Sequence, residues 1–557
     1  MTKFFELLDL NARHLWLIVP ELLVMTGFLL GLVLDCVLPE ARRKTTAYIC
    51  LVFLVGALFA NMVDWNALVH ERPVRHTRSH EEIIFVQAES GTVEALTHKR
   101  YEGAKPAILE SKPIFSGMLA RDGFAMYFKL LLLLGTSVSI IMALHAKNLV
   151  GPNRGEFFLL LTATCLGGMF LSSATNLLMI YLSLEALSVI SYALAGYLKQ
   201  DRKSAEAGIK YVIYGAMASG IMIFGMSYLY GLTGSLNLTG VGGVAEKFNE
   251  LRHASVGAKG AYLAVLAMVF CGLFYKIAVA PFHYWSPDVY EGAPTTATGF
   301  FSVVPKAAGF AVLVRVLAEF FPLGYSNHVA GAGYTRLELA LAVLAVLTMS
   351  IGNLAALAQS NAKRMLAYSS IAHAGYMLAG LSVLDVDKQG HAGGPAAVLF
   401  YLLVYLFMNL GAFLVLVALE NARGSCELKD LRGMVRREPL LAVALVAFLF
   451  SLTGLPPLAG FTGKYLIMLK LADRGSWMLI LFIGFNSVIS LYYYMRLAKS
   501  VVIDSPEAEA VATEPAPLVF NLLAVSKVIM LVVLFVFFKP VFDICVQVLE
   551  PLPRMLQ

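Results

Sequence analysis

The stretch Cys271–Pro294, CGLFYKIAVAPFHYWSPDVYEGAP, decides the fold. It places Lys276 inside an apolar run that begins near Ala261, and Pro281 and His283 follow shortly after. A lysine at mid-depth in a bilayer costs about 2.5–3.5 kcal/mol on insertion scales, and a proline inside a helix costs roughly 3 kcal/mol because it removes a backbone hydrogen bond. Both fit a broken helix that lines a polar cavity and neither fits a lipid-facing helix. We therefore expect an interrupted membrane helix in which Lys276 exchanges protons with other buried charges.

The composition around this stretch is that of a polytopic membrane protein. Of the 557 residues, 59% are hydrophobic and 14% are charged, and the mean hydropathy is +0.73, which excludes a soluble core. The net charge of +6 is expected from basic cytoplasmic loops and requires no nucleic-acid partner. The six cysteines form no C-x-x-C pair. We therefore expect no iron–sulfur, zinc or disulfide framework and no cofactor or metal held by this chain.

Hydropathy predicts an all-α protein with about 14 segments of membrane-spanning length. The first segment carries Glu21 and Asp35 and is too long for a signal-peptide core, so we expect it to remain as a span. The expected limits are 15–38, 45–64, 115–144, 156–174, 176–198, 205–231, 260–285, 295–320, 337–358, 363–384, 395–419, 440–470, 477–498 and 517–538.

Basic residues indicate the orientation of these segments. Lys and Arg gather in the connectors that follow odd-numbered segments, at 42–44, 199–203, 363–364 and 423–437. Because short cytoplasmic loops carry an excess of Lys and Arg, we expect both termini on the periplasmic side of a bacterial inner membrane.

The order of the segments indicates internal symmetry. Five segments fall within 151–320 and five within 336–500, and an odd number of spans turns the second unit upside down. The fourth span of the first unit carries Lys276, and the fourth span of the second carries Pro456, Pro457 and Lys464. Proline-interrupted spans at matching positions of inverted units indicate an ion pathway. The remaining parts are an N-terminal three-helix segment, 1–150, and an acidic loop with a last helix, 501–557.

A polar insert, Trp65–Ile114, interrupts the N-terminal segment. It is rich in His and Glu, and its run Ile83–Val86 is compatible with a short strand. The insert either docks a neighbouring subunit or is a solvated loop. The spacing of His70, His76 and His80 fits no standard metal-ligand pattern.

Four charges lie deep in the predicted spans. Glu185 is near the middle of its span, where a lone carboxyl is either protonated or paired. Lys306 directly follows Pro305 at mid-span, and a lysine satisfied by neighbouring carbonyls is its alternative. Lys464 lies nearer to one end of its span, so its stem is able to reach the interface. The fourth deep charge is Lys276, described above.

Four further titratable groups are candidates. Lys210 lies a few residues inside its span and Glu156 opens another, where an acid at a helix N-terminus is favoured in any case. His373 lies well inside its span and His283 just past the break, and a neutral imidazole at either place is able to relay protons or to pack. Burial disfavours the charged ammonium and a nearby carboxylate restores it. We therefore expect protons to pass from Lys276 to Lys306 and on to Lys464 when the pairing with Glu185 changes.

Several motifs resemble the subunit N family of bacterial proton-pumping NADH–quinone oxidoreductase (complex I). They are LEALSVISYALAGY, GIKYVIYGAMASGIMIFGMSYLYG, FYKIAVAPFHYWSPDVYEGAPT, KRMLAYSSIAHAGYMLAG and LTGLPPLAGFTGKY. The resemblance covers nearly the whole chain and implies an antiporter-like fold of 14 helices with two inverted five-helix units and broken helices seven and twelve. It implies proton translocation without a bound redox centre, in a hetero-oligomer with other membrane subunits that include neighbouring antiporter-like ones.

The resemblance also implies roles for individual residues. The family's key glutamate of helix five falls on Glu185, and its lysines of helices seven, eight and twelve fall on Lys276, Lys306 and Lys464. Its helix-six lysine and helix-four glutamate match two further positions, Lys210 and Glu156. The insert 65–114 departs from most members, so its contacts do not follow from the family.

The sequence also allows three alternative functions to be compared with this one. A subunit of a multisubunit sodium/proton antiporter would share the fold, and copurification with flavin and iron–sulfur subunits would discriminate. A redox enzyme that carries haem or quinone lacks support because the spans hold no paired histidines placed for haem. A passive scaffold fits poorly with four deep charges, each of which is expensive to bury.

Overall fold

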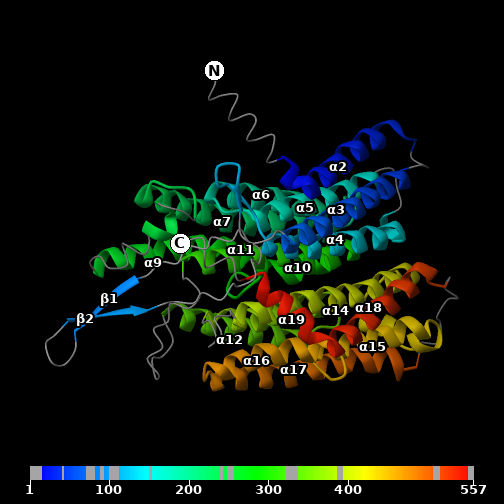
Figure 1. Cartoon of the computed structure of the whole chain (residues 1–557). Helices are drawn as coiled ribbons and strands as arrows, with labels where there is room; N and C mark the ends of the chain where they lie inside the picture. Colours follow the sequence, from blue (N-terminus) through cyan, green and yellow to red (C-terminus); the bar gives the residue numbers. More distant parts are fainter. Residues whose placement is uncertain are drawn as a thin grey trace.

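The computed structural model describes residues 15–39, 43–70, 82–87, 93–98, 112–149, 154–238, 242–247, 256–320, 336–384, 393–505 and 515–549. Long helices lie side by side in two groups (Figure 1). The upper group holds α2 (Val19–Val37), α3 (Lys44–His70), α4 (Gly123–Leu144), α5 (Arg154–Ser173), α6 (Leu177–Ala195), α7 (Arg202–Thr233), α9 (Val256–Ile277), α10 (Trp285–Gly292) and α11 (Thr295–Phe320).

The lower group holds the second half of the chain. Its helices are α12 (Arg336–Leu357), α13 (Ala362–Leu381), α14 (Gly393–Arg423), α15 (Pro439–Thr453), α16 (Ala459–Asp473), α17 (Trp477–Val502), α18 (Leu518–Val536) and α19 (Phe538–Gln547). Short 3-10 turns occupy Trp16–Ile18, Lys147–Leu149, Leu428–Leu431 and Met434–Arg436.

The helices confirm the predicted all-α polytopic class. Within the described ranges, eleven helices are long and apolar enough to cross a membrane. The predicted span 363–384 corresponds to α13. The predicted spans 260–285 and 440–470 correspond to two interrupted helices, α9–α10 and α15–α16. The total of fourteen spans and the inverted symmetry stay predictions.

Polar residues at the expected boundaries start several of these helices. The side chains of Asp122, Asn176, Asp201 and Asn361 each accept a hydrogen bond from a backbone N–H two or three residues further on, at 2.7–3.2 Å. Such N-caps satisfy amide groups that the first helical turn leaves without a partner. The starts of α6, α7 and α13 therefore lie close to the predicted limits.

Both predicted helix breaks are present, and polar groups satisfy the backbone there. In the first break, the Ala280 N–H donates to Thr348 Oγ1 at 3.1 Å, and Trp285 Nε1 donates to the Tyr275 carbonyl at 3.0 Å. In the second, the Gly460 N–H donates to Ser451 Oγ at 3.2 Å. Backbone at membrane depth leaves the helical conformation only where protein or water supplies such partners.

The region around the polar insert differs from the sequence prediction. Helix α3 continues to His70, and α4 begins at Gly123 because residues 112–121 form a hairpin of β3 (Lys112–Ile114) and β4 (Leu119–Arg121). The predicted strand at 83–86 is confirmed within β1 (Glu82–Gln87), which pairs antiparallel with β2 (Val93–His98). His76, His80 and the side chain of His70 lie outside the described residues.

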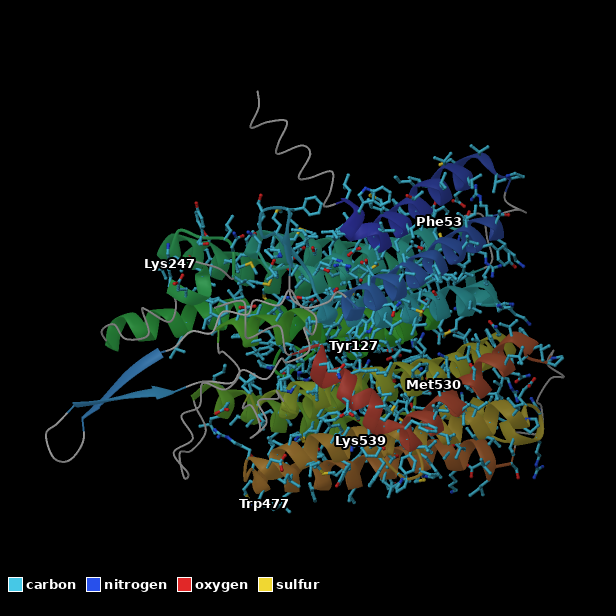
Figure 2. The ribbon with its side chains drawn as sticks, in the orientation of Figure 1. Phe53, Tyr127, Lys247, Trp477, Met530 and Lys539 are labelled. Carbon is cyan, nitrogen blue, oxygen red and sulfur yellow. The ribbon has the colours of Figure 1, made fainter. Side chains whose placement is uncertain are left out.

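Helix α11 occupies the centre of the molecule. All of its residues are buried, and it packs against helices of both groups, including α4, α5, α13 and α14. A second link between the groups is Tyr127 of α4, whose hydroxyl donates to the Leu399 carbonyl of α14 at 2.8 Å (Figure 2). The central position of α11 places Lys306 where the two halves meet.

Candidate functional site

Lys276 lies at the C-terminal end of α9, directly before the first break. It is 2% exposed, and its ammonium donates a hydrogen bond to Ser188 Oγ of α6 at 3.0 Å. The same ammonium lies 5.9 Å from the centre of the Tyr211 ring. The lysine stem passes Gly309 of α11, where an added Cβ would lie 3.4 Å from Lys276 Cγ. A small residue in α11 thus leaves room for this lysine.

Glu185 lies on the same helix as Ser188, about one turn earlier, so the two side chains share a face of α6. The carboxyl is half-buried, and its Oε1 is buried without a hydrogen-bond partner. It is close enough to Lys276 for the two charges to interact, but in the described part of the chain they form no ion pair within 4.0 Å. A modest side-chain movement would therefore change their pairing.

Lys306 points from α11 into the second group of helices. It is 2% exposed, and its ammonium donates to Ser370 of α13, at 2.5 Å to Oγ and 2.8 Å to the carbonyl. The residue before it is Pro305, which has no backbone N–H to contribute to the helix. Lys306 thus bridges the two halves of the molecule.

A buried group of hydroxyls surrounds His373 on the same face of α13. His373 Nδ1 lies 2.6 Å from the Tyr401 hydroxyl, and its Nε2 lies 3.2 Å from the Tyr494 hydroxyl. The Tyr494 hydroxyl is also hydrogen-bonded to Ser369, the neighbour of Ser370. This group extends the polar contacts of Lys306 toward α14 and α17.

Lys464 lies in the first half of α16, beyond the second break. It is 4% exposed, and its ammonium donates to the Thr453 carbonyl at 2.8 Å and lies 3.4 Å from Ser487 Oγ. The ammonium also lies 4.5 Å from the centre of the Tyr376 ring. The structure therefore buries Lys464 and does not extend it to the interface.

The three lysines share one feature: each ammonium is buried and held by neutral oxygen atoms. Within the described residues, none of Lys276, Lys306 and Lys464 has a carboxylate within 4.0 Å. A buried charge without a counter-charge is expensive.

Three of the predicted site residues lie outside this hydrogen-bonded set. Glu156 is exposed in the first turn of α5. His283 is 4% exposed within the first break, and its Nδ1 has no partner. Lys210 has a side chain that is 35% exposed and forms ion pairs of 2.6 Å with both Asp288 and Glu206.

The partners of Lys210 belong to a network that holds α10 in place. Arg364 of α13 lies 2.8 Å from Asp288 and 2.9 Å from Glu291, both on α10. Lys203 of α7 also contacts Glu291, at 2.9 Å. The network ties the short helix of the first break to one helix of each group.

Sequence reasoning missed the neutral partners of the lysines and several other buried charges. Ser188, Ser370, Tyr401 and Tyr494 carry no signal of their own, because hydroxyl residues are common in apolar spans. The missed charges were detectable as ionisable residues inside predicted spans. They include Lys129, Arg315, Glu319 and Lys527.

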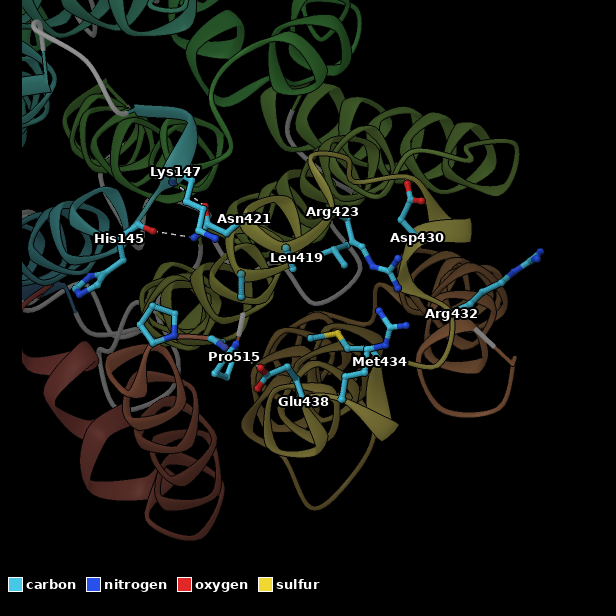
Figure 3. Close-up of a pocket in the computed structure, with 15 residues that line it drawn as sticks. His145, Lys147, Leu419, Asn421, Arg423, Asp430, Arg432, Met434, Glu438 and Pro515 are labelled. Carbon is cyan, nitrogen blue, oxygen red and sulfur yellow. Dashed lines mark hydrogen bonds between the residues drawn. The ribbon is translucent and has the colours of Figure 1, made fainter. Parts of the chain in front are cut away.

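A separate pocket lies at the ends of α4 and α14, near the starts of α15 and α18 (Figure 3). Asn421 crosses it, accepting from the Lys147 N–H and donating to the His145 carbonyl, both at 2.7 Å. Its lining is mainly basic, with Arg423, Arg432 and Arg437 beside the acidic Asp430 and Glu438. These residues come from the basic connectors, so the pocket is remote from the buried lysines.

Comparison with known proteins identifies the class of this fold. Residues 174–490 match the family described as NADH:quinone oxidoreductase/Mrp antiporter, TM. A chain of the Mrp complex from Dietzia sp. DQ12-45-1b shares the fold, with a TM-score of 0.73 over 95% of this chain and 96% of that one, at 19% identity. The protein is therefore an antiporter-like membrane protein.

Closer relatives define the family. NADH-quinone oxidoreductase subunit N of Anaeromyxobacter sp. (strain Fw109-5) is 40% identical over 91% of each chain. Subunit N 2 of Sorangium cellulosum (strain So ce56) is 44% identical over 78% of this chain and 84% of its own. A chain of respiratory complex I from Thermus thermophilus with bound aureothin covers 94% of this chain and 98% of its own, at 32% identity and a TM-score of 0.69. The chain belongs to the NADH-quinone oxidoreductase subunit N family, which confirms the predicted resemblance.

Proposed function

We propose that this chain translocates protons as a membrane subunit of NADH-quinone oxidoreductase and has no redox centre of its own. Protons pass along a mid-membrane relay of Glu185, Lys276, Lys306, His373 and Lys464. The observation that carries the proposal is the burial of three lysines whose ammonium groups are held by hydroxyl and carbonyl oxygens. A fold that needed fixed cations there would supply carboxylates to neutralise them.

The first step depends on the distance between Glu185 and Lys276. When the carboxylate turns toward the ammonium, their attraction holds the proton on Lys276. When the carboxylate is shielded or moves away, Lys276 releases the proton toward Lys306. Water molecules carry it between the two lysines, because the described contacts join them through no protein hydrogen bond.

The second step passes through hydroxyl groups. A Ser or Tyr hydroxyl accepts one hydrogen bond while it donates another, so it takes up a proton on one side and gives one up on the other. Ser370 contacts Lys306, and the group formed by Ser369, Tyr494 and His373 lies beside it. A neutral imidazole likewise accepts at one nitrogen and donates at the other. The Tyr376 ring and Ser487 then mark the approach to Lys464.

The same proposal includes the architecture and setting that the sequence predicts. Two inverted five-helix units, 151–320 and 336–500, carry one broken helix each, and α11 is the last helix of the first unit. The chain resides in a bacterial inner membrane with both termini periplasmic, next to other antiporter-like subunits of a hetero-oligomeric complex. The roles of Lys210 and Glu156 at the ends of the route rest on the family resemblance, and that of His283 on its burial and unpartnered Nδ1.

A sodium/proton antiporter subunit is the alternative, and the fold shared with the Mrp complex is the observation in its favour. The two functions predict different partners. Copurification of the tagged chain with flavin and iron–sulfur subunits supports the oxidoreductase, whereas their absence from an otherwise intact complex supports the antiporter.

NADH-driven acidification of inverted membrane vesicles tests the relay. In Lys276→Ala, coupled proton transfer should be lost, and in Glu185→Gln it should fall because the lysine loses the charge that favours its protonated form. NADH oxidation with an artificial acceptor reports that the redox subunits are active, and their copurification with the tagged variant reports that the complex is intact. Acidification at the wild-type rate in Lys276→Ala contradicts the proposal.

A further inference from the structure

We propose, on the basis of the function above, that a stripe of buried polar groups along α4 carries protons from the depth of the lysine relay to the outer face. Its members from the middle outward are Thr136, the Lys129–Glu21 pair, and the Asp122–Arg315 pair with Glu319. The stripe would connect the relay described above to the outer end of this half of the molecule.

The stripe follows from the spacing along α4. Asp122, Lys129 and Thr136 are seven residues apart, which places them on one face of a helix at intervals of about 10 Å. Thr136 lies at the depth of Lys306, because its neighbour Gly135 packs against Val304 of α11, where an added Cβ would come within 2.6 Å of Val304 Cγ2.

The middle of the stripe is a buried ion pair between α4 and α2. Lys129 Nζ lies 2.7 Å from Glu21 Oε1, and the two side chains are only 5% and 1% exposed. Cys165 of α5 contacts Thr136 and is within electrostatic range of Glu21, so it connects the first two members of the stripe. A carboxylate and an ammonium in contact are able to exchange a proton and become neutral together.

The outer part of the stripe contains the buried carboxyl group of Glu319 next to the Asp122–Arg315 ion pair. Arg315 of α11 holds Asp122 through two hydrogen bonds of 2.9 and 3.1 Å. Glu319 lies one turn further along α11 and interacts electrostatically with both charges, yet it is fully buried, and among the described residues neither of its oxygens has a hydrogen-bond partner. Because a buried carboxyl without partners is costly, its presence next to a satisfied ion pair indicates a group that takes up and releases a proton.

The stripe reaches the protein surface through the neighbour of Asp122. Arg121 Nη2 lies 3.0 Å from Asp64 Oδ1 at the end of α3, and the Asp64 side chain is 23% exposed. The gaps of about 10 Å between the members are bridged by water, as in other buried polar channels. All members thus lie between the relay and the end of the bundle where α11 finishes.

The experiment measures vesicle acidification per NADH oxidised, in the assembled complex. In Glu319→Gln the side chain keeps its size and loses no hydrogen bond, so a packing role predicts no change and the proposal predicts loss of acidification. Glu319→Asp, which restores a titratable group, should recover part of it. Asp473→Asn, an exposed carboxylate at the end of α16, is the matched control and should pump like the wild type.

A double variant separates a structural ion pair from a proton-carrying one. Replacing a buried pair by apolar residues of similar size is often neutral for stability. Glu21→Met with Lys129→Met should therefore assemble normally but lose acidification. Normal acidification in this variant and in Glu319→Gln, with loss in Lys276→Ala, overturns the stripe and leaves the relay intact. Normal acidification in Lys276→Ala overturns the relay itself.

Discussion

Each broken helix carries a buried lysine near its break, but Lys276 lies before the first break and Lys464 after the second, and their surroundings differ. Lys276, directly before the first break, contacts Ser188 of α6, and the carboxyl of Glu185 lies one turn away from Ser188 along α6. Lys464 in the second break contacts the Thr453 carbonyl and Ser487, and no carboxylate within the described ranges lies within 4.0 Å of it. The first lysine thus has a counter-charge that is able to approach and retreat, whereas the second depends on neutral groups alone.

The two breaks also differ in their ion pairs and in the residue at which the backbone leaves the helix. Ion pairs from α7 and α13 fix α10 of the first break through Asp288 and Glu291. The chain enters the second break through Gly454, whose φ is +90°, and the first through Ala278, whose φ is +58°. Under the proposed relay, this difference predicts that a changing charge controls the first lysine, while the second receives protons in a setting that stays neutral.

The largest predicted effect comes from giving the second lysine a permanent counter-charge. Ser487→Asp places a carboxylate at the position that now lies 3.4 Å from Lys464. The attraction is about 4 kcal/mol at 4 Å and an effective dielectric constant of 20, so Lys464 should keep its proton and acidification should be lost. The matched control Ser487→Asn has the shape of the aspartate without its charge, so it should retain more acidification than Ser487→Asp. Equal pumping in both variants would remove the distinction between the breaks.

A smaller effect is expected from the backbone of the second break. Gly454→Ala puts a residue with a side chain in the left-handed backbone conformation, which costs roughly 1–2 kcal/mol. The new Cβ would also lie 3.0 Å from Lys464 Cδ. The variant should lower the unfolding temperature of the purified complex and reduce acidification. An unchanged rate of acidification would show that proton transfer tolerates a displacement of Lys464.

Weakening the ion pairs of the first break should have a modest effect on stability. Arg364→Ala removes contacts to Asp288 and Glu291 whose side chains are 31% and 22% exposed. Partly exposed pairs contribute about 0.2–1 kcal/mol each, so thermal unfolding should shift slightly and the shift should shrink at high salt. A large loss of stability that is insensitive to salt would show that α10 is held by packing.

The smallest effect is expected at the entry to the first break. Ala278→Gly relieves the left-handed strain, worth about 1 kcal/mol, but gives the unfolded chain freedom worth about 0.4–1 kcal/mol. Because Ala278 is fully buried, the change also removes a methyl group worth about 0.8 kcal/mol, so the unfolding temperature should fall slightly. A strong stabilisation would mean that the break stores more strain than φ at this one residue accounts for.

Much of the fold was predictable because a bilayer imposes simple rules. The span limits follow from hydropathy, and the breaks follow from Pro281 and from Pro456 with Pro457, since proline inside an apolar span demands a polar setting. The limit at 115 was wrong by eight residues, because the apolar Ile114 and Leu119 belong to the β3–β4 hairpin. Periodicity does not distinguish a short buried strand from the end of a helix.

The site was predictable only in its charged members. Lys306 and Lys464 stand out because a charge inside an apolar span needs a reason, and both are buried in the structure. Tyr494 comes from α17 and is far from His373 in sequence, so tertiary packing alone brings them together. Lys129 and Glu21 both lie in predicted spans, but only tertiary packing brings α2 and α4 together as partners.

The most direct test of the account replaces Lys306 by a cation that cannot release its proton. Lys306→Arg keeps the positive charge, and arginine stays protonated in proteins. The matched control is Lys363→Arg, a buried lysine that donates to the Ala293 carbonyl at 2.8 Å. Vesicles with Lys306→Arg should oxidise NADH with an artificial acceptor yet fail to acidify, while the control should acidify. Normal acidification with arginine at position 306 would contradict the relay.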